Sequence, residues 1–202
     1  MMKSLTYIPF LILSISSCTV FYPLVGIRNA KQLSDEKIEK YARKVGITNE
    51  NIYKIDPSLF GILDSIKNKS LRNDLIQPLQ FIYFDASDSA QLHLPNCYVG
   101  GFPKLLWNNE GSFDQYPPER KIFGVVDTVF YKPDLMRYIV PLQGNSVHPE
   151  DFEGEVIIIL YARVLHKNAK HLVKLMDDYQ SKFPEAKVVY VNTDNGYFFD
   201  EL

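Results

Sequence analysis

Two cysteines are the residues of this 202-residue chain whose side chains could do the most chemistry. Cys18 follows Lys3, an apolar stretch over residues 5–15, and two serines. This is the layout of a secretory signal, with a basic start, an apolar middle and small residues before the cut. Cys97 lies in the loop-like segment 95–103. Because a thiol can be acylated, oxidised or used as a nucleophile, the surroundings of each cysteine decide its role.

The run Ile-Ser-Ser-Cys at 15–18 resembles the lipobox of bacterial lipoproteins. The resemblance implies that residues 1–17 are removed as a signal peptide, that Cys18 receives lipid carrying acyl chains such as palmitate, and that the mature chain begins there. Thr19 follows in place of an aspartate, which for this family implies the outer membrane, facing the periplasm. Two alternatives stay open. The segment could be a transmembrane anchor, although the stretch 5–15 is shorter than the roughly 20 apolar residues that span a bilayer. It could also be a plain secretory signal in which Cys18 is incidental.

Acylation of Cys18 would leave Cys97 as the only thiol in an oxidising compartment, so no disulfide could form within the chain. One interpretation is a structural loop with an inert cysteine, and another is a thiol paired with a second chain. The third is a binding loop or single-thiol redox site, in which adjacent glycines allow close approach of a ligand. The candidate residues of that loop are Asn96, Cys97, Tyr98, Gly100 and Gly101.

The histidines do not nominate a metal site. His93 and Cys97 would need two further ligands from distant sequence. His166 and His171 are five residues apart, a spacing that places them on different faces of a helix. We therefore expect no metal and no bound cofactor.

The hydrophobic pattern predicts an α/β domain, with α+β as the alternative. We expect helices after Ser34 up to Gly46 and after Pro57, and a helical turn at 134–138. Strand-like segments are expected at 52–55, at the hairpin 79–85 and 91–94, at 104–107 and at 122–130. The clearest part is a βαβ unit with a right-handed crossover, made of the strand 156–161, a helix ending at Pro184 and the strand 187–191.

The segments 151–156, 160–162 and 189–194 resemble the central strands of thioredoxin-like, redoxin-type domains. The resemblance implies a three-layer sheet and, in active members, a Cys-x-x-Cys pair after the first of these strands. Here that place holds Leu165-His166-Lys167-Asn168, so the usual dithiol chemistry has no nucleophile. Upstream strands at 79–85 and 122–130 would have to complete the sheet.

Composition agrees with one domain at 32–202 joined by a tether at 18–31 to the lipid. The chain is 46% hydrophobic with a formal net charge of -2 and shows no cluster of Lys and Arg in the sequence, which argues against nucleic acid or an anionic membrane surface as a partner. The sequence therefore predicts a bacterial envelope lipoprotein, held to a membrane through Cys18, whose thioredoxin-like domain is a non-catalytic binding or scaffolding module for an envelope partner. The alternative is a redox enzyme or peroxide-responsive protein that uses Cys97.

Overall fold

The computed structural model describes residues 28–29, 31–48, 52–65, 67, 69–108, 111–119, 131–142 and 147–201. The α/β class is confirmed, because a six-stranded sheet of mixed direction lies between helices on both faces. The helices are α1 (Asp35–Val45), α2 (Ser58–Asp64), α3 (Lys69–Leu75), α4 (Lys132–Met136) and α5 (His166–Lys182), with 3-10 segments η2 (Pro149–Asp151) and η3 (Asp194–Glu201). The strands are β1 (Tyr53–Ile55), β2 (Leu79–Phe84), β3 (Ala90–Pro95), β4 (Ile139–Pro141), β5 (Val156–Tyr161) and β6 (Val188–Asn192).

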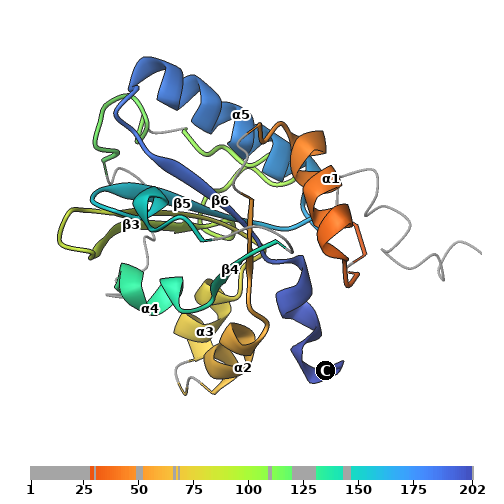
Figure 1. Cartoon of the computed structure of the whole chain (residues 1–202). Coiled ribbons are helices and arrows are strands. Elements are labelled where there is room, and N and C mark those ends of the chain that lie inside the picture. Colours follow the sequence, from red (N-terminus) through yellow and green to blue (C-terminus); the bar gives the residue numbers. More distant parts are fainter. Residues whose placement is uncertain are drawn as a thin grey trace, which may run out of the picture.

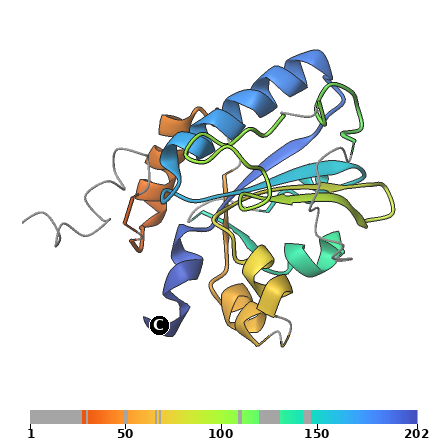
Figure 2. The ribbon, with the colours of Figure 1, turned by 180° about the vertical axis from the view of Figure 1, so that it is seen from behind.

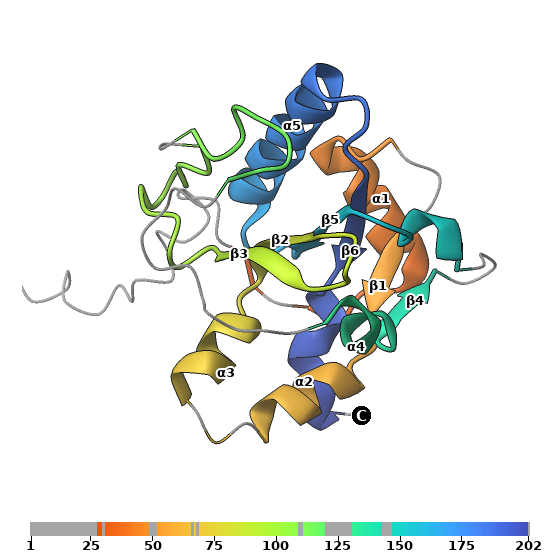
Figure 3. The same cartoon turned by 90° about the vertical axis from the view of Figure 1, so that its left-hand side faces the viewer.

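The strands lie side by side in the order β3-β2-β5-β6-β1-β4, which Figure 3 shows across the sheet. β6 pairs in parallel with both β5 and β1, and the remaining pairs are antiparallel. The expected unit of two parallel strands joined by a helix is therefore present as β5, α5 and β6. β2 runs antiparallel beside β5, so an upstream hairpin extends the sheet as predicted.

One face of the sheet is covered by α1, α5 and the described parts of the loop 99–119, which are residues 99–108 and 111–119, and we call this the upper layer (Figure 1). Alternate side chains of β2 and β5, such as Phe81 and Ile159, point into this layer. They share one core with Leu172 and Met176 of α5, and both of these are fully buried. Trp107 of the loop is also fully buried, so the loop completes the upper core.

The opposite face is covered by α2, α3, α4 and η3, which we call the lower layer and which Figure 2 shows from behind. Its core contains Ile82, Ile158 and Val191 from the sheet, with Leu135 from α4. Alternation along each strand thus divides the apolar residues between two cores. Both faces of β5 are buried, as its continuous apolar run predicts.

Helix limits follow the expected signals. α1 ends at Gly46, whose φ of 109° is left-handed and whose N–H returns to the carbonyls of Ala42 and Arg43. α5 ends at Lys182, shortly before Pro184, which cannot continue the helix.

The strand expected at 104–107 is wrong. Leu105 and Trp107 are buried there, but the backbone N–H of Leu105 bonds to the Asn168 side chain and not to a neighbouring strand. The pattern did not predict α3 or β4. The segment 122–130 and Cys18 lie outside the described residues, so the strand and the acylation expected there stay predictions.

Candidate functional site

The loop that carries Cys97 starts where β3 ends. β3 and β5 both run antiparallel to β2, so this loop leaves the sheet at the same end as the turn after β5. The Asn96 N–H donates to the Leu79 carbonyl at 2.9 Å, and the Leu79 N–H donates to Asn96 Oδ1 at 3.2 Å. The Tyr98 N–H donates to the Pro95 carbonyl at 3.0 Å. Asn96 and Tyr98 therefore hold the end of the hairpin through their backbone and amide groups.

The Cys97 thiol is exposed, with Sγ 4.0 Å from Asp74 Oδ1 on α3. Partial burial and then the Asp74 charge raise the pKa of this thiol. A thiol attacks as its thiolate, and reactive cysteines lie near positive charge that lowers the pKa. The surroundings of Cys97 act in the opposite direction and favour the protonated, unreactive form.

The two candidate glycines shape their own turn. Gly100 and Gly101 have φ values of 70° and 75°, which favour glycine. A Cβ on Gly101 would lie 2.5 Å from Leu106 Cγ and 2.7 Å from the Lys104 carbonyl oxygen. Glycine is therefore required at 101 because Lys104 and Leu106 of the same loop pack closely against it.

In the segment 165–168, where the sequence resemblance places a Cys-x-x-Cys pair, Asn168 joins the loop 99–119 to α5. Asn168 is buried in the first turn of α5. Its Oδ1 accepts the Leu105 N–H at 3.0 Å, and its Nδ2 donates to the Pro103 carbonyl at 3.1 Å. The loop 99–119 thus reaches the start of α5 through Pro103 and Leu105, while Cys97 contacts α3 in the lower layer.

A pocket of about 260 Å³ lies between the lower layer and the sheet. An engineered apolar cavity of about 150 Å³ is large enough to bind benzene. The lower-layer pocket can therefore hold an aromatic ring or a short acyl chain. Its apolar walls come from the helices α2, α3 and α4 and from the strands β2 and β5. The side chains are Leu59, Ile62, Leu63, Leu75, Ile82, Leu135 and Leu160.

Gln80 is the polar residue in the sheet wall of this pocket. Its Nε2 donates to the carbonyls of Leu75 and Gln77, both at 2.8 Å, and its Oε1 lies 2.6 Å from Nε2 of buried His93. Burial lowers the pKa of His93 to about 4, so the ring is neutral at pH 7. These bonds fix the Gln80 amide as a rigid wall.

The pocket rim carries charge. Asp134, Arg137 and Tyr138 line it, and Arg137 Nη2 lies 3.6 Å from Asp134 Oδ1. Both charged side chains are more than half exposed, with fractions of 73% and 60%. Such exposed pairs contribute little to stability. Arg137 can therefore exchange Asp134 for an anionic group on a ligand at little cost.

A second polar cluster lies at the carboxyl ends of β5 and β6. Asp194 is buried, and its oxygens accept the Arg163 N–H at 2.9 and 3.1 Å and the Asn192 Nδ2 at 2.9 Å. Burial raises the pKa of this carboxyl. Nearby, the Tyr41 hydroxyl donates to the Ala162 carbonyl at 3.4 Å.

The last residues of the predicted tether form hydrogen bonds to the residues beside this cluster. The Arg28 N–H donates to the Val164 carbonyl at 2.8 Å, and Arg163 Nη2 donates to the Asn29 carbonyl at 2.8 Å. A little further on, the Leu33 N–H donates to Asn195 Oδ1 at 2.7 Å, and Asn195 Nδ2 returns a bond to the Leu33 carbonyl at 2.8 Å. The chain therefore enters the domain at the carboxyl ends of the central strands.

Within the described ranges, no three His, Cys, Asp or Glu side chains are grouped so that they could hold a metal ion. No helix among those same residues is long and apolar enough to cross a membrane. The chain matches no protein-family model, no curated protein and no solved structure. Function has to be inferred from the geometry.

The pocket and the cluster at Asp194 were not predicted from sequence. The pocket walls are leucines and isoleucines that the helical and strand patterns assign only to the core. Asp194 belongs to the segment 189–194 that carries the thioredoxin-like resemblance, and its place shortly after a buried strand is the one signal that could have found it.

Proposed function

We propose that this protein is a bacterial envelope lipoprotein whose α/β domain is a non-catalytic binding module. Its Cys18 is acylated, and its lower-layer pocket takes an aromatic or short acyl group from an envelope partner or small molecule. The single observation that supports binding is the apolar pocket of about 260 Å³ with a charged rim. Ligand sites are typically apolar hollows with a few placed polar groups.

The domain is proposed to be a rearranged thioredoxin-like fold. The unit β5-α5-β6 and the antiparallel strands β2 and β3 next to β5 support this assignment. The hairpin precedes the unit in the chain, which is the rearrangement. Asn168, bonded to the loop 99–119, stands where the family carries a cysteine and supports a structural role for that turn.

Benzoate and toluene test the pocket, because both carry a ring of suitable size and only benzoate carries a charge for Arg137. We expect saturable shifts of the Ile82 and Leu135 methyl signals in NMR titrations with either probe. Arg137→Gln should weaken benzoate binding several-fold and leave toluene binding unchanged.

Ile62→Trp provides the blocking variant. Ile62 lines the pocket but is 49% exposed, so a larger side chain can fill the mouth without entering the core. Phe102→Trp, at a 60% exposed position away from the pocket, is the matched control. Ile62→Trp should abolish binding of both probes, whereas Phe102→Trp should bind as the wild type does. If the wild type shows no saturable shift, or if Ile62→Trp binds equally well, the pocket is not the binding site.

The lipid anchor is tested by acyl labelling, and the second cysteine, Cys97, provides the control. Cells grown with a tagged fatty acid should label the wild type and Cys97→Ala, but not Cys18→Ala. Label on Cys18→Ala would remove the anchor from the proposal. If Cys97 instead reacts rapidly with a thiol reagent at neutral pH and Cys97→Ser abolishes a reductase or peroxidase activity, the non-catalytic assignment is wrong.

A further inference from the structure

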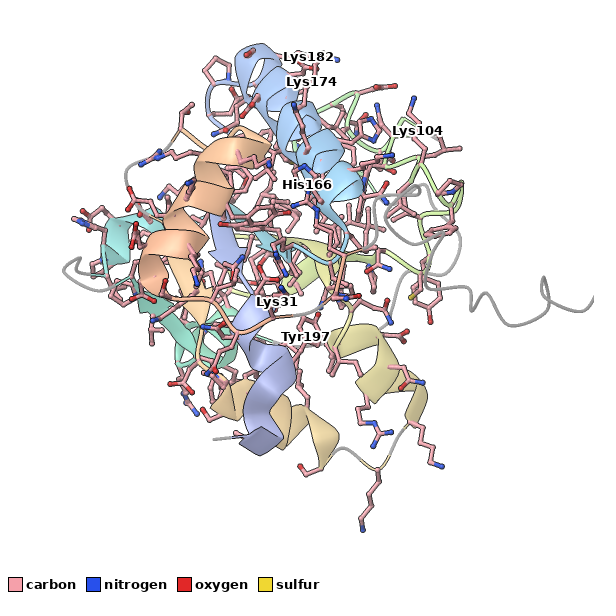
Figure 4. The ribbon with its side chains drawn as sticks, turned by 90° about the vertical axis from the view of Figure 1, so that its right-hand side faces the viewer. Lys31, Lys104, His166, Lys174, Lys182 and Tyr197 are labelled. Atoms are coloured by element: carbon pink, nitrogen blue, oxygen red, sulfur yellow. The ribbon has the colours of Figure 1, made fainter. Side chains whose placement is uncertain are left out.

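Basic side chains from four separate parts of the sequence meet at the carboxyl end of the central strands. Arg28 precedes α1, Lys44 lies in the last turn of α1, Arg163 follows β5, and Lys170 lies in α5. We call these four residues the basic end. Three of them, Arg28, Lys44 and Lys170, act electrostatically on His166, which Figure 4 shows at the start of α5 with Lys31 below it.

Contacts fix the two arginines of the basic end relative to each other and bring together the helices that carry its two lysines. The Arg28 N–H bonds to Val164, and the Arg163 side chain bonds to the Asn29 carbonyl, so these two arginines lie in adjoining segments. The Tyr41 ring of α1 lies 5.7 Å from the His166 ring of α5, measured between centroids. This ring contact brings the two helices together at the same place.

The electrostatics agree with this arrangement. Burial, followed by the charges of Arg28, Lys44 and Lys170, lowers the pKa of His166. The first turn of α5, all of which the structure describes, carries no acidic side chain. The positive end of the dipole of this 17-residue helix therefore adds to the basic side chains. Asp194, the carboxylate of the adjoining cluster, is buried and already accepts three hydrogen bonds.

The place where the chain enters the domain indicates which way the basic end faces. Arg28 lies ten positions after Cys18, and an extended chain spans at most about 3.3–3.6 Å per residue. A lipid on Cys18 therefore keeps Arg28 within about 35 Å of the membrane surface. Since Arg28 belongs to the basic end, the tether joins the domain at this end and limits its distance from the membrane.

We propose that the basic end faces the anchoring membrane and binds the anionic headgroups of its phospholipids. The inference rests on the proposed anchor at Cys18. Lys and Arg side chains near a bilayer are attracted to anionic lipids over roughly one Debye length. The anchor supplies the local concentration, and the basic end sets the orientation. The domain then stands on the membrane with the carboxyl ends of β5 and β6 toward the lipid.

Energy transfer from the protein to a headgroup-labelled lipid tests this orientation. The full acylated chain carries a fluorescent amino acid either at Lys167, in the first turn of α5, or at Ser181, near its other end. Both positions are exposed and lie about 21 Å apart along one helix. On vesicles containing phosphatidylglycerol, transfer from position 167 should exceed transfer from position 181 at least twofold. The difference should shrink on phosphatidylcholine vesicles, in high salt, and in the double variant R28E/K170E.

Two outcomes overturn the orientation: equal transfer from both positions on anionic vesicles, or a difference that neither lipid charge nor the double variant changes. The anchor is tested separately by the acyl mass on Cys18. If that mass is absent, the full chain in a Cys97→Ser background is coupled through Cys18 to a maleimide lipid, and the same transfer is measured. Failure of the anchor and failure of the basic end are then distinguished.

Discussion

On the upper face of the sheet, α5 runs for 17 residues and packs with α1 over the central strands, whereas on the lower face three helices of seven, seven and five residues share the task. The long helix carries a continuous stripe of buried side chains, from Ala169 to Tyr179. The short helices meet at angles to one another and leave the pocket between Leu63, Leu135 and Leu160. The long helix thus lies over a continuous buried stripe, and the short helices lie around the pocket.

Polar groups also differ between the two layers. In the upper layer, Asn168 joins the loop 99–119 to α5. In the lower layer, the buried pair of Gln80 and His93 lies in and behind the wall of the pocket. Each polar group stabilises the layer in which it lies, and each can be removed separately.

The largest expected effect comes from truncating one leucine in each layer. Leu172→Ala, in α5, should lower the free energy of unfolding by about 4 kcal/mol, because it leaves a cavity in a filled core. Leu135→Ala should cost about 2 kcal/mol, since that side chain already faces the pocket and loses fewer contacts. Urea unfolding measures both values, and equal losses would remove the distinction between the two faces.

Acidification should lower the stability of the fold through His93 in the lower layer. The pKa of His93 falls from its ordinary value of 6.5 to about 4 on folding, because of burial. The unfolded chain therefore takes up this proton first, and the contribution of His93 is lost as the pH falls from 6.5 toward 4. The loss reaches at most about 3 kcal/mol. His93→Gln keeps a polar partner for Gln80 and cannot titrate, so its stability should fall less between pH 7.5 and 4.5. An unchanged slope in the variant would assign the pH dependence to other groups.

Asn168 should stabilise the upper layer by a smaller amount. Asn168→Ala leaves the Leu105 N–H and the Pro103 carbonyl without their partner, a loss of about 2 kcal/mol. Lys170→Ala, at an exposed position two residues along α5, should change stability by no more than about 0.5 kcal/mol. Thermal unfolding compares the two variants, and similar melting temperatures would show that Asn168 is not a structural link.

The smallest effect concerns Cys97. Asp74→Asn removes a negative charge near the thiol, so the pKa of Cys97 should fall and its rate of reaction with iodoacetamide at pH 7.5 should rise about threefold. Burial, the larger cause of the raised pKa, remains in the variant. Asp134→Asn, which removes a carboxylate at the pocket rim, should leave the rate unchanged. A faster reaction in both variants would indicate a general effect of charge.

The sequence predicted the central unit because local patterns are strongest there. The run of β-branched residues in β5, the stripe of α5 and Pro184 each act over a few residues, and the structure confirms the elements they predict. The segment 104–107 has a similar apolar pattern, yet its backbone bonds to Asn168, a partner 63 residues away from Leu105. Only tertiary structure determines that bond.

Neither proposed surface can be found by sequence patterns of this kind. The pocket walls are ordinary core residues, and a hollow depends on how short helices pack. The basic end combines Arg28, Lys44, Arg163 and Lys170, which are dispersed in a chain of formal net charge -2. No local run of basic residues marks it, and only the contacts at the carboxyl ends of the strands bring it together.

The order of the strands has a consequence for how the chain acquires its fold. β5 and β6 occupy the middle of the sheet but follow the other four described strands in the sequence. The β2–β3 hairpin and the β1–β4 pair thus have no common partner until residues 156–192 have been made. A chain that depends on such distant pairings folds slowly. Synthesis therefore has to reach residue 192 before the six described strands can all pair in one sheet.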